Sequence, residues 1–141
     1  MKKILCMLLI TIMCVTLLAS CNKDSSTEAD NSTAISKSNL SAAYISCCKG
    51  EKEEYAELAY DNMSLTIDTN PDDSVYNDCE SNALSAIVSI NSFLDLPSSL
   101  IDKMSSTRAL DGMQSQDCGT YTVTWNYHPD NGMKVIYEVN P

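Results

Sequence analysis

His128 is the residue best suited to proton transfer, and it is the single histidine of the chain. Beside the carboxylate of Asp130 or Glu138, its imidazole could serve as a general base. However, it opens the segment His128–Gly132, whose proline, asparagine and glycine are typical of a turn. Neither a G-x-S-x-G motif nor a catalytic-cysteine motif accompanies it. The pattern favours a turn or surface role, and we expect no catalytic residues and no enzymatic activity.

The side chains of Asp68, Asn70 and Asp72 have the spacing of the first ligands of a calcium-binding loop. The rest of that motif fails, because Asp73 replaces the glycine of the sharp turn and Cys79 stands where a bidentate glutamate is needed. Zinc would require close ligand pairs such as C-x-x-C, which the sequence lacks. We therefore expect the acids to favour the start of a helix, and we predict neither a metal site nor a cofactor.

Cys21 lies at a sharp border between apolar and polar sequence. Lys2 and Lys3 precede an uncharged apolar run over residues 4–19, as in a secretory signal peptide. This run is at or below the roughly 17–25 residues that a membrane-spanning helix needs. The run ends in Leu18-Ala19-Ser20-Cys21, which matches all four positions of a lipobox. The segment therefore resembles the signal peptide of bacterial lipoproteins.

That resemblance implies lipidation of Cys21 and removal of residues 1–20. A diacylglyceryl thioether, with fatty acyl chains such as palmitate, would hold the protein on the extracytoplasmic face of a bacterial cell membrane. One acyl chain anchors a protein to a membrane only marginally, whereas two acyl chains hold it there stably. An uncleaved N-terminal anchor and a secreted protein with an incidental Cys21 are the alternatives.

Composition bounds what the mature chain can bind. Removal of 20 of the 141 residues leaves 141 − 20 = 121, which suits one small domain and a tether. Loss of Lys2 and Lys3 leaves 7 of the 9 basic residues against 19 acidic ones, so the net charge is 7 − 19 = −12. Such a surface repels nucleic acid and anionic lipid headgroups. We expect no nucleic-acid partner, and we expect the acidity to support solubility or a basic partner.

Four cysteines, Cys47, Cys48, Cys79 and Cys118, remain besides Cys21. Export permits disulfides, and four cysteines allow three pairings. The adjacent Cys47 and Cys48 are not expected to bond each other, and Lys49 alone gives weak support for redox activity. A disulfide between Cys79 and Cys118 would tie a helix to the start of a hairpin, which makes it the candidate pairing.

The N-terminal half of the mature chain combines a polar stretch with short apolar segments. Residues 21–39 are rich in Ser, Thr, Asn and Asp, so we expect a lipidated cysteine and a disordered tether, followed by a folded domain over residues 40–141. Residues 51–60 fit either a helix or a strand. The alternating segment Ser64–Asp68 after a turn favours a hairpin over Tyr55–Asp68.

The centre of the chain predicts two helices. Apolar residues recur at spacings of three and four over Ser74–Leu94, which indicates a helix. Pro97 ends it and suits the first turn of a second helix over Pro97–Thr107. A loop is expected over Asp111–Gly119.

The C-terminal segment predicts a second hairpin with a defined register. Tyr121, Val123, Trp125 and Tyr127 share one face, and folding at the turn pairs them with Val139, Tyr137, Val135 and Met133. The order is ββααββ, which predicts a small two-layer α+β domain with one antiparallel sheet. We expect its aromatic face to form the core. The opposite, Thr-rich face, with Lys134, Ile136 and Glu138, is the better candidate surface.

The sequence thus favours a lipid-anchored cell-envelope protein that acts as a non-catalytic binding or interaction module. It resembles the short lipoproteins of Gram-positive bacteria in its lipobox. An inhibitor or immunity-type protein that blocks a specific partner is one alternative. A minor envelope hydrolase that uses His128 is the other.

Overall fold

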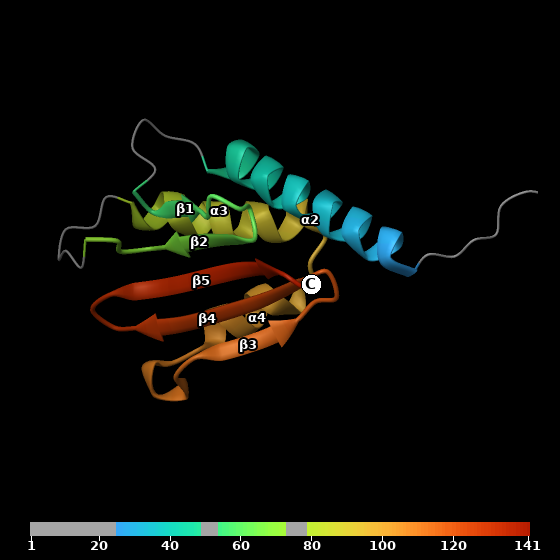
Figure 1. The fold of residues 1–141 in the computed structure, drawn as a ribbon. Coiled ribbons are helices and arrows are strands. Elements are labelled where there is room, and N and C mark those ends of the chain that lie inside the picture. The colour runs from blue at the N-terminus through green and yellow to red at the C-terminus, as the bar shows by residue number, and fades with distance from the viewer. Residues whose placement is uncertain (1–24, 49–53, 73–78) are drawn as a thin grey trace, which may run out of the picture.

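The computed structural model describes residues 25–48, 54–72 and 79–141. Within them the chain forms three α-helices, a short 3-10 turn and five strands (Figure 1). The elements are α2 Ser25–Cys47, β1 Ala56–Leu58, β2 Ser64–Asp68, α3 Glu80–Phe93, α4 Ser99–Ser106, η1 Ala109–Asp111, β3 Gln114–Asp117, β4 Tyr121–His128 and β5 Gly132–Val139. The strands form one antiparallel sheet in the order β1-β2-β5-β4-β3, so the predicted α+β class is confirmed.

The hairpin of β4 and β5 is the centre of the sheet, and its predicted register is confirmed. Tyr121 pairs with Val139, Val123 with Tyr137, Trp125 with Val135, and Tyr127 with Met133. Most of this apolar face is buried, although Tyr127 at the turn end is 38% exposed. Cross-strand apolar pairs stabilise one register, because a slip of one residue would turn every side chain to the wrong face.

The first hairpin lies beside β5. Residues 56–58 are a strand, which settles the ambiguity of this segment, and Ser64–Asp68 is β2 as predicted. Leu65 and Ile67 are fully buried. Because β2 pairs with β5, the two predicted hairpins join into a single sheet with the final strand near its centre.

Two of the helices are the ones the spacing predicts, with shorter bounds. The described part of the first begins at Glu80, and residues 74–78 lie outside the described residues. Ile87 and Ile90 of α3 are buried on the sheet, as are Leu100 and Met104 of α4. Burying each such aliphatic side chain contributes about 1.5–3 kcal/mol, so these stripes hold both helices on the sheet.

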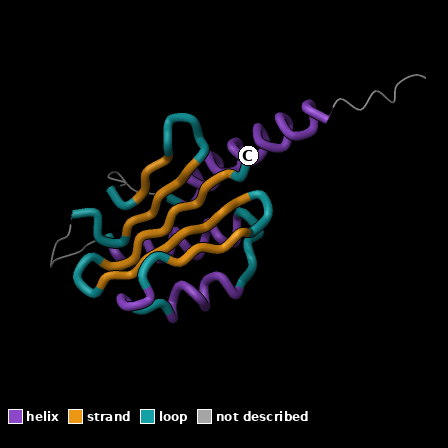
Figure 2. Tube along the Cα trace, turned by 60° about the horizontal axis from the view of Figure 1, so that its bottom comes forward, coloured by secondary structure: helices purple, strands orange, loops and turns teal. Residues whose placement is uncertain are grey.

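The tether expected over residues 21–39 needs a correction. Residues 25–39 are helical and belong to α2, while residues 21–24 lie outside the described residues. The helix docks through fully buried Leu40 and Ala43, and the Tyr121 hydroxyl donates a 3.1 Å hydrogen bond to the carbonyl of Ser36. Its N-terminal turns run past the sheet (Figures 1 and 2).

The loop expected over Asp111–Gly119 also needs a correction, because it contains strand β3. Gln114–Asp117 is polar on both faces, so it lacks the alternation that identifies a strand. It forms because β4 offers a free row of main-chain donors and acceptors, with Ser115 opposite Thr124. A polar outer strand also protects the sheet against pairing with another chain.

Candidate functional site

The helices that the structure describes leave one face of the sheet open. α2 and α3 lie behind the sheet in Figure 2, and α4 packs on the same side through Leu100 and Met104 of the common core. Along β2, β4 and β5, buried residues alternate with more exposed ones, because successive side chains of a strand point to opposite faces. The open face therefore presents every second residue of these strands.

Three rows of neighbouring residues run across this open face. The first row crosses all five strands and contains Glu57, Thr66, Ile136, Thr124 and Ser115 in that order. The second contains Ser64, Glu138, Thr122 and Asp117, and the third contains Asp68, Lys134 and Asn126. Hydroxyls and carboxylates predominate, and Ile136 is the one large aliphatic residue of the three rows. None of these side chains is buried.

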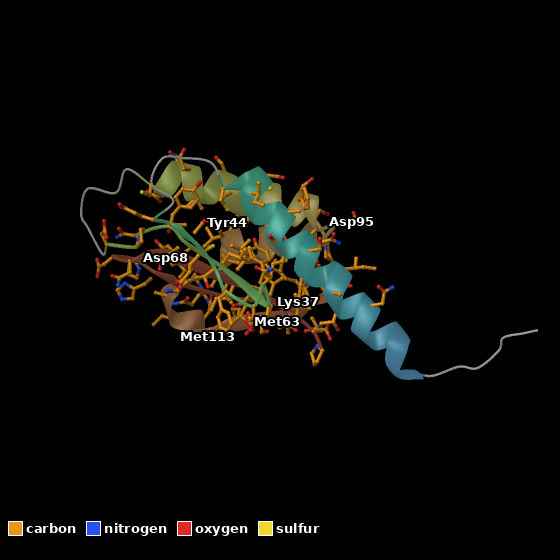
Figure 3. The ribbon with its side chains drawn as sticks, turned by 45° about the horizontal axis from the view of Figure 1, so that its top comes forward. Lys37, Tyr44, Met63, Asp68, Asp95 and Met113 are labelled. Atoms are coloured by element: carbon orange, nitrogen blue, oxygen red, sulfur yellow. The ribbon has the colours of Figure 1, made fainter. Side chains whose placement is uncertain are left out.

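A groove crosses one end of the open face. Asp68 marks that end, whereas Met63 lies at the other end of β2 (Figure 3). The Lys134 Nζ and Asp68 Oδ2 atoms are 3.2 Å apart and, with Pro71, form a wall shared by two hollows. One hollow of about 400 Å³ extends to Asn126 and His128, and the other, of about 200 Å³, extends to β1.

The loop after β2 is fastened to the β4–β5 turn, which fixes the shape of the groove. The buried Thr69 accepts a 2.7 Å hydrogen bond from the Met133 amide, and the buried Asn70 donates a 3.1 Å bond to the Asp130 carbonyl. Asp68 Oδ1 accepts a hydrogen bond from the Asn70 amide, while Asp68 Oδ2 pairs with Lys134. The described residues contain no cluster of His, Cys, Asp and Glu that could hold a metal ion.

His128 lies on the turn, as the sequence predicts, with 52% of its side chain exposed. Its Nδ1 accepts hydrogen bonds from the amides of Asp130 and Asn131, which places the proton of the neutral ring on Nε2. The Asp130 carboxylate is 4.0 Å from Nδ1, whereas Glu138 lies six residues along β5 from Gly132, the partner of His128, or roughly 20 Å away. Among the residues that the structure describes, no serine or cysteine lines the hollow beside the ring.

A third hollow, of about 390 Å³, lies between α4 and β3, with Trp125 in its lining. Its polar groups mostly bond one another. Trp125 Nε1 donates to the Thr107 hydroxyl at 2.8 Å, and Lys103 Nζ donates to Gln116 at 2.6 Å. The Arg108 guanidinium donates hydrogen bonds to the Asp111 carboxylate and lowers its pKa below the ordinary value. The first two bonds fasten the end of α4 to β4 and β3, and the third closes η1, so these groups have a structural role.

The candidate disulfide between Cys79 and Cys118 is not formed. α3, which follows Cys79, begins at the end of the sheet where β5 starts, whereas the β3–β4 turn that contains Cys118 lies at the opposite end (Figure 1). The sequence could not reveal this separation, because it depends on the direction in which α3 crosses the sheet. Cys48 is buried at the end of α2, and Cys47 is partly buried beside it.

Tyr137 links the core to α3 below the open face. Its hydroxyl accepts a 2.9 Å hydrogen bond from Asn91 Nδ2, and burial raises the pKa of the phenol above its ordinary value. Burial disfavours the charged phenolate, so the hydroxyl acts in the core as a neutral hydrogen-bonding group. The residue is fully enclosed, so it positions β5 and takes no part in a surface site.

Sequence reasoning found part of the open face and missed its edges. The Thr-rich side of the C-terminal hairpin, with Lys134, Ile136 and Glu138, is confirmed as solvent-facing. Glu57 and Asp117 were missed, because their membership depends on strand order and on β3.

The lipobox residues 18–21 lie outside the described residues. Among the helices that the structure describes, none combines the length and the apolar character needed to cross a bilayer. Comparison of the chain with family models, with curated proteins and with solved structures gives no match.

Proposed function

We propose that this chain is a lipid-anchored cell-envelope protein whose domain acts as a non-catalytic binding module. Cys21 carries the lipid, and the domain stands on the extracytoplasmic face of a bacterial membrane. The match of Leu18-Ala19-Ser20-Cys21 to the lipobox supports the anchor.

The observation that carries the binding role is the uncovered face of the five-stranded sheet. All three described helices occupy one side, and none of them covers the opposite side, which supports a role in binding a partner. Its side chains offer hydroxyl donors and acceptors around Ile136, such as Thr66 and Thr124. Protein interfaces commonly combine such a small apolar centre with a polar rim.

A hydrolase is less well supported, although His128 borders the larger hollow of the groove. The Nδ1 atom already accepts hydrogen bonds from two main-chain amides, and the described lining residues include no serine or cysteine nucleophile. An exposed turn also lacks the dry, enclosed surroundings that strengthen catalytic electrostatics.

Replacement of Cys21 by serine should abolish lipidation and release the protein from the membrane, because serine has no thiol to form the thioether. The measurements are incorporation of labelled palmitate and fractionation of cells. Cys118→Ser is the control and should retain both the label and the membrane location. Membrane attachment of unprocessed Cys21→Ser protein, at the level of the parent, would disprove the lipid anchor.

A photoreactive amino acid at Thr124, in the centre of the open face, should form one stoichiometric adduct on intact cells. The same group at Val88, which is 53% exposed on α3, is the control and should form none. Gel analysis of the adducts gives the result. Equal adducts from both positions, or none from position 124, would contradict binding through this face.

A further inference from the structure

The open sheet face has an unbalanced charge. Its three rows contain the carboxylates of Glu57, Asp68, Asp117 and Glu138 but a single cation, Lys134. That lysine is paired with Asp68 at 3.2 Å. The other three carboxylates have no cationic partner within the rows, and Glu57, Asp117 and Glu138 are all exposed.

These three carboxylates border the centre of the face on three sides. Glu57 lies on β1, two strands from Ile136, and Asp117 lies on β3, two strands from Glu138. At about 4.8 Å between strands, each separation is about 10 Å. Ile136, Thr66 and Thr124 form the middle of this frame. The arrangement is an apolar and hydroxyl centre with an acidic rim.

We propose that the open sheet face binds a basic protein surface, with lysine or arginine side chains of the partner opposite Glu57, Asp117 and Glu138. This inference rests on the proposed binding function and names the partner class for the same face. Complementary charge steers encounter and fixes the orientation of a complex.

The charge of the face argues against the other occupants. A second copy of the chain, docked face to face, would bring the same carboxylates together, because a two-fold interface uses the same patch twice. Anionic lipid and nucleic acid would meet the same repulsion. A basic protein is the macromolecule whose charge complements this face.

The size of the face sets the expected strength. Five strands of three to eight residues, at about 4.8 Å between strands and about 3.4 Å per residue, give an area on the order of 500 Å². Stable complexes bury roughly 800 Å² on each partner. We therefore expect a transient and salt-sensitive complex. At physiological salt, the attraction between exposed charges is largely screened beyond about 8 Å.

The test is a titration of the full chain, purified in a nonionic detergent, with a deca-lysine peptide. NMR of the ¹⁵N-labelled protein should show shifts at the amides of Thr66, Thr124 and Ile136. The double variant Glu57→Gln with Glu138→Gln should raise the Kd roughly twofold to thirtyfold, the effect of two exposed ion pairs. The dissociation constant should also rise with salt.

The matched control is Glu80→Gln with Asp102→Asn, two exposed acids on α3 and α4. It changes the net charge equally and should alter the Kd less than twofold. Equal losses in both variants, shifts confined to the helices, or binding of deca-glutamate or phosphatidylglycerol vesicles to this face would overturn the proposal. The titration uses the purified chain, so its result does not depend on whether Cys21 anchors the protein in cells. The anchor is tested separately by the Cys21→Ser variant.

Discussion

Replacement of Leu40 by alanine is expected to lower the free energy of unfolding by about 2–5 kcal/mol. Leu40 lies on α2 and has no exposed surface, and it belongs to the core shared by the sheet and α3. Truncation removes the buried methyl groups and leaves a cavity that the packed surroundings fill only in part. Urea denaturation of the mature chain, followed by fluorescence of the single tryptophan, Trp125, measures the loss.

The control for this prediction is Ile45→Ala on the same helix. Ile45 is 70% exposed, so its truncation should change the free energy of unfolding by no more than about 0.5 kcal/mol. The contrast separates docking of α2 from its helix propensity, because both variants introduce the same residue. Equal, small effects of the two variants would show that α2 does not pack on the domain in solution.

Replacement of Gly132 by alanine is expected to cost about 2–4 kcal/mol of stability. The backbone of Gly132 has φ = +74°, a conformation that side chains disfavour. A Cβ atom there would also collide with the Thr69 hydroxyl, which accepts the Met133 amide. This collision would disrupt the hydrogen bond that fastens the loop after β2 to the β4–β5 turn. The loss of stability therefore combines backbone strain with a broken hydrogen bond. Chemical denaturation measures the change in the free energy of unfolding.

Gly119→Ala provides a control with a similar backbone and free space. Gly119 has φ = +80°, and a Cβ atom at this position would meet nothing within 4 Å. Its substitution should cost only about 1 kcal/mol, the penalty for the left-handed conformation. If Gly119→Ala and Gly132→Ala were equally destabilising, the contact with Thr69 would contribute nothing measurable to the turn.

The hairpins could be predicted because their determinants are local. In the C-terminal pair, alternation of apolar and polar residues on both sides of one turn determines the register, and Trp125 opposite Val135 is an example. The spacing of Ile87 and Ile90 likewise determines the buried side of α3. The lipobox is also local, and it carries the proposed role of Cys21 by itself.

The candidate site could be predicted only in part, because a sheet face is assembled from distant segments. Thr122 and Thr124 were assigned correctly to the solvent side from their alternation with the aromatic residues. The acidic rim needs Glu57 and Asp117, whose positions follow from the order β1-β2-β5-β4-β3. No spacing within the chain reveals that residues 57 and 117 share a face.

The sequence by itself determined the α+β class, the two hairpins and the helices between them, because periods of two and of three to four are read directly along the chain. Only the tertiary structure decided the rest. A polar segment became β3 when β4 supplied main-chain partners, and residues 25–39 continued a helix that Leu40 docks on the core. Both outcomes depend on hydrogen bonds and burial that distant elements supply. In the same assembly the described helices leave one acidic face of the sheet uncovered.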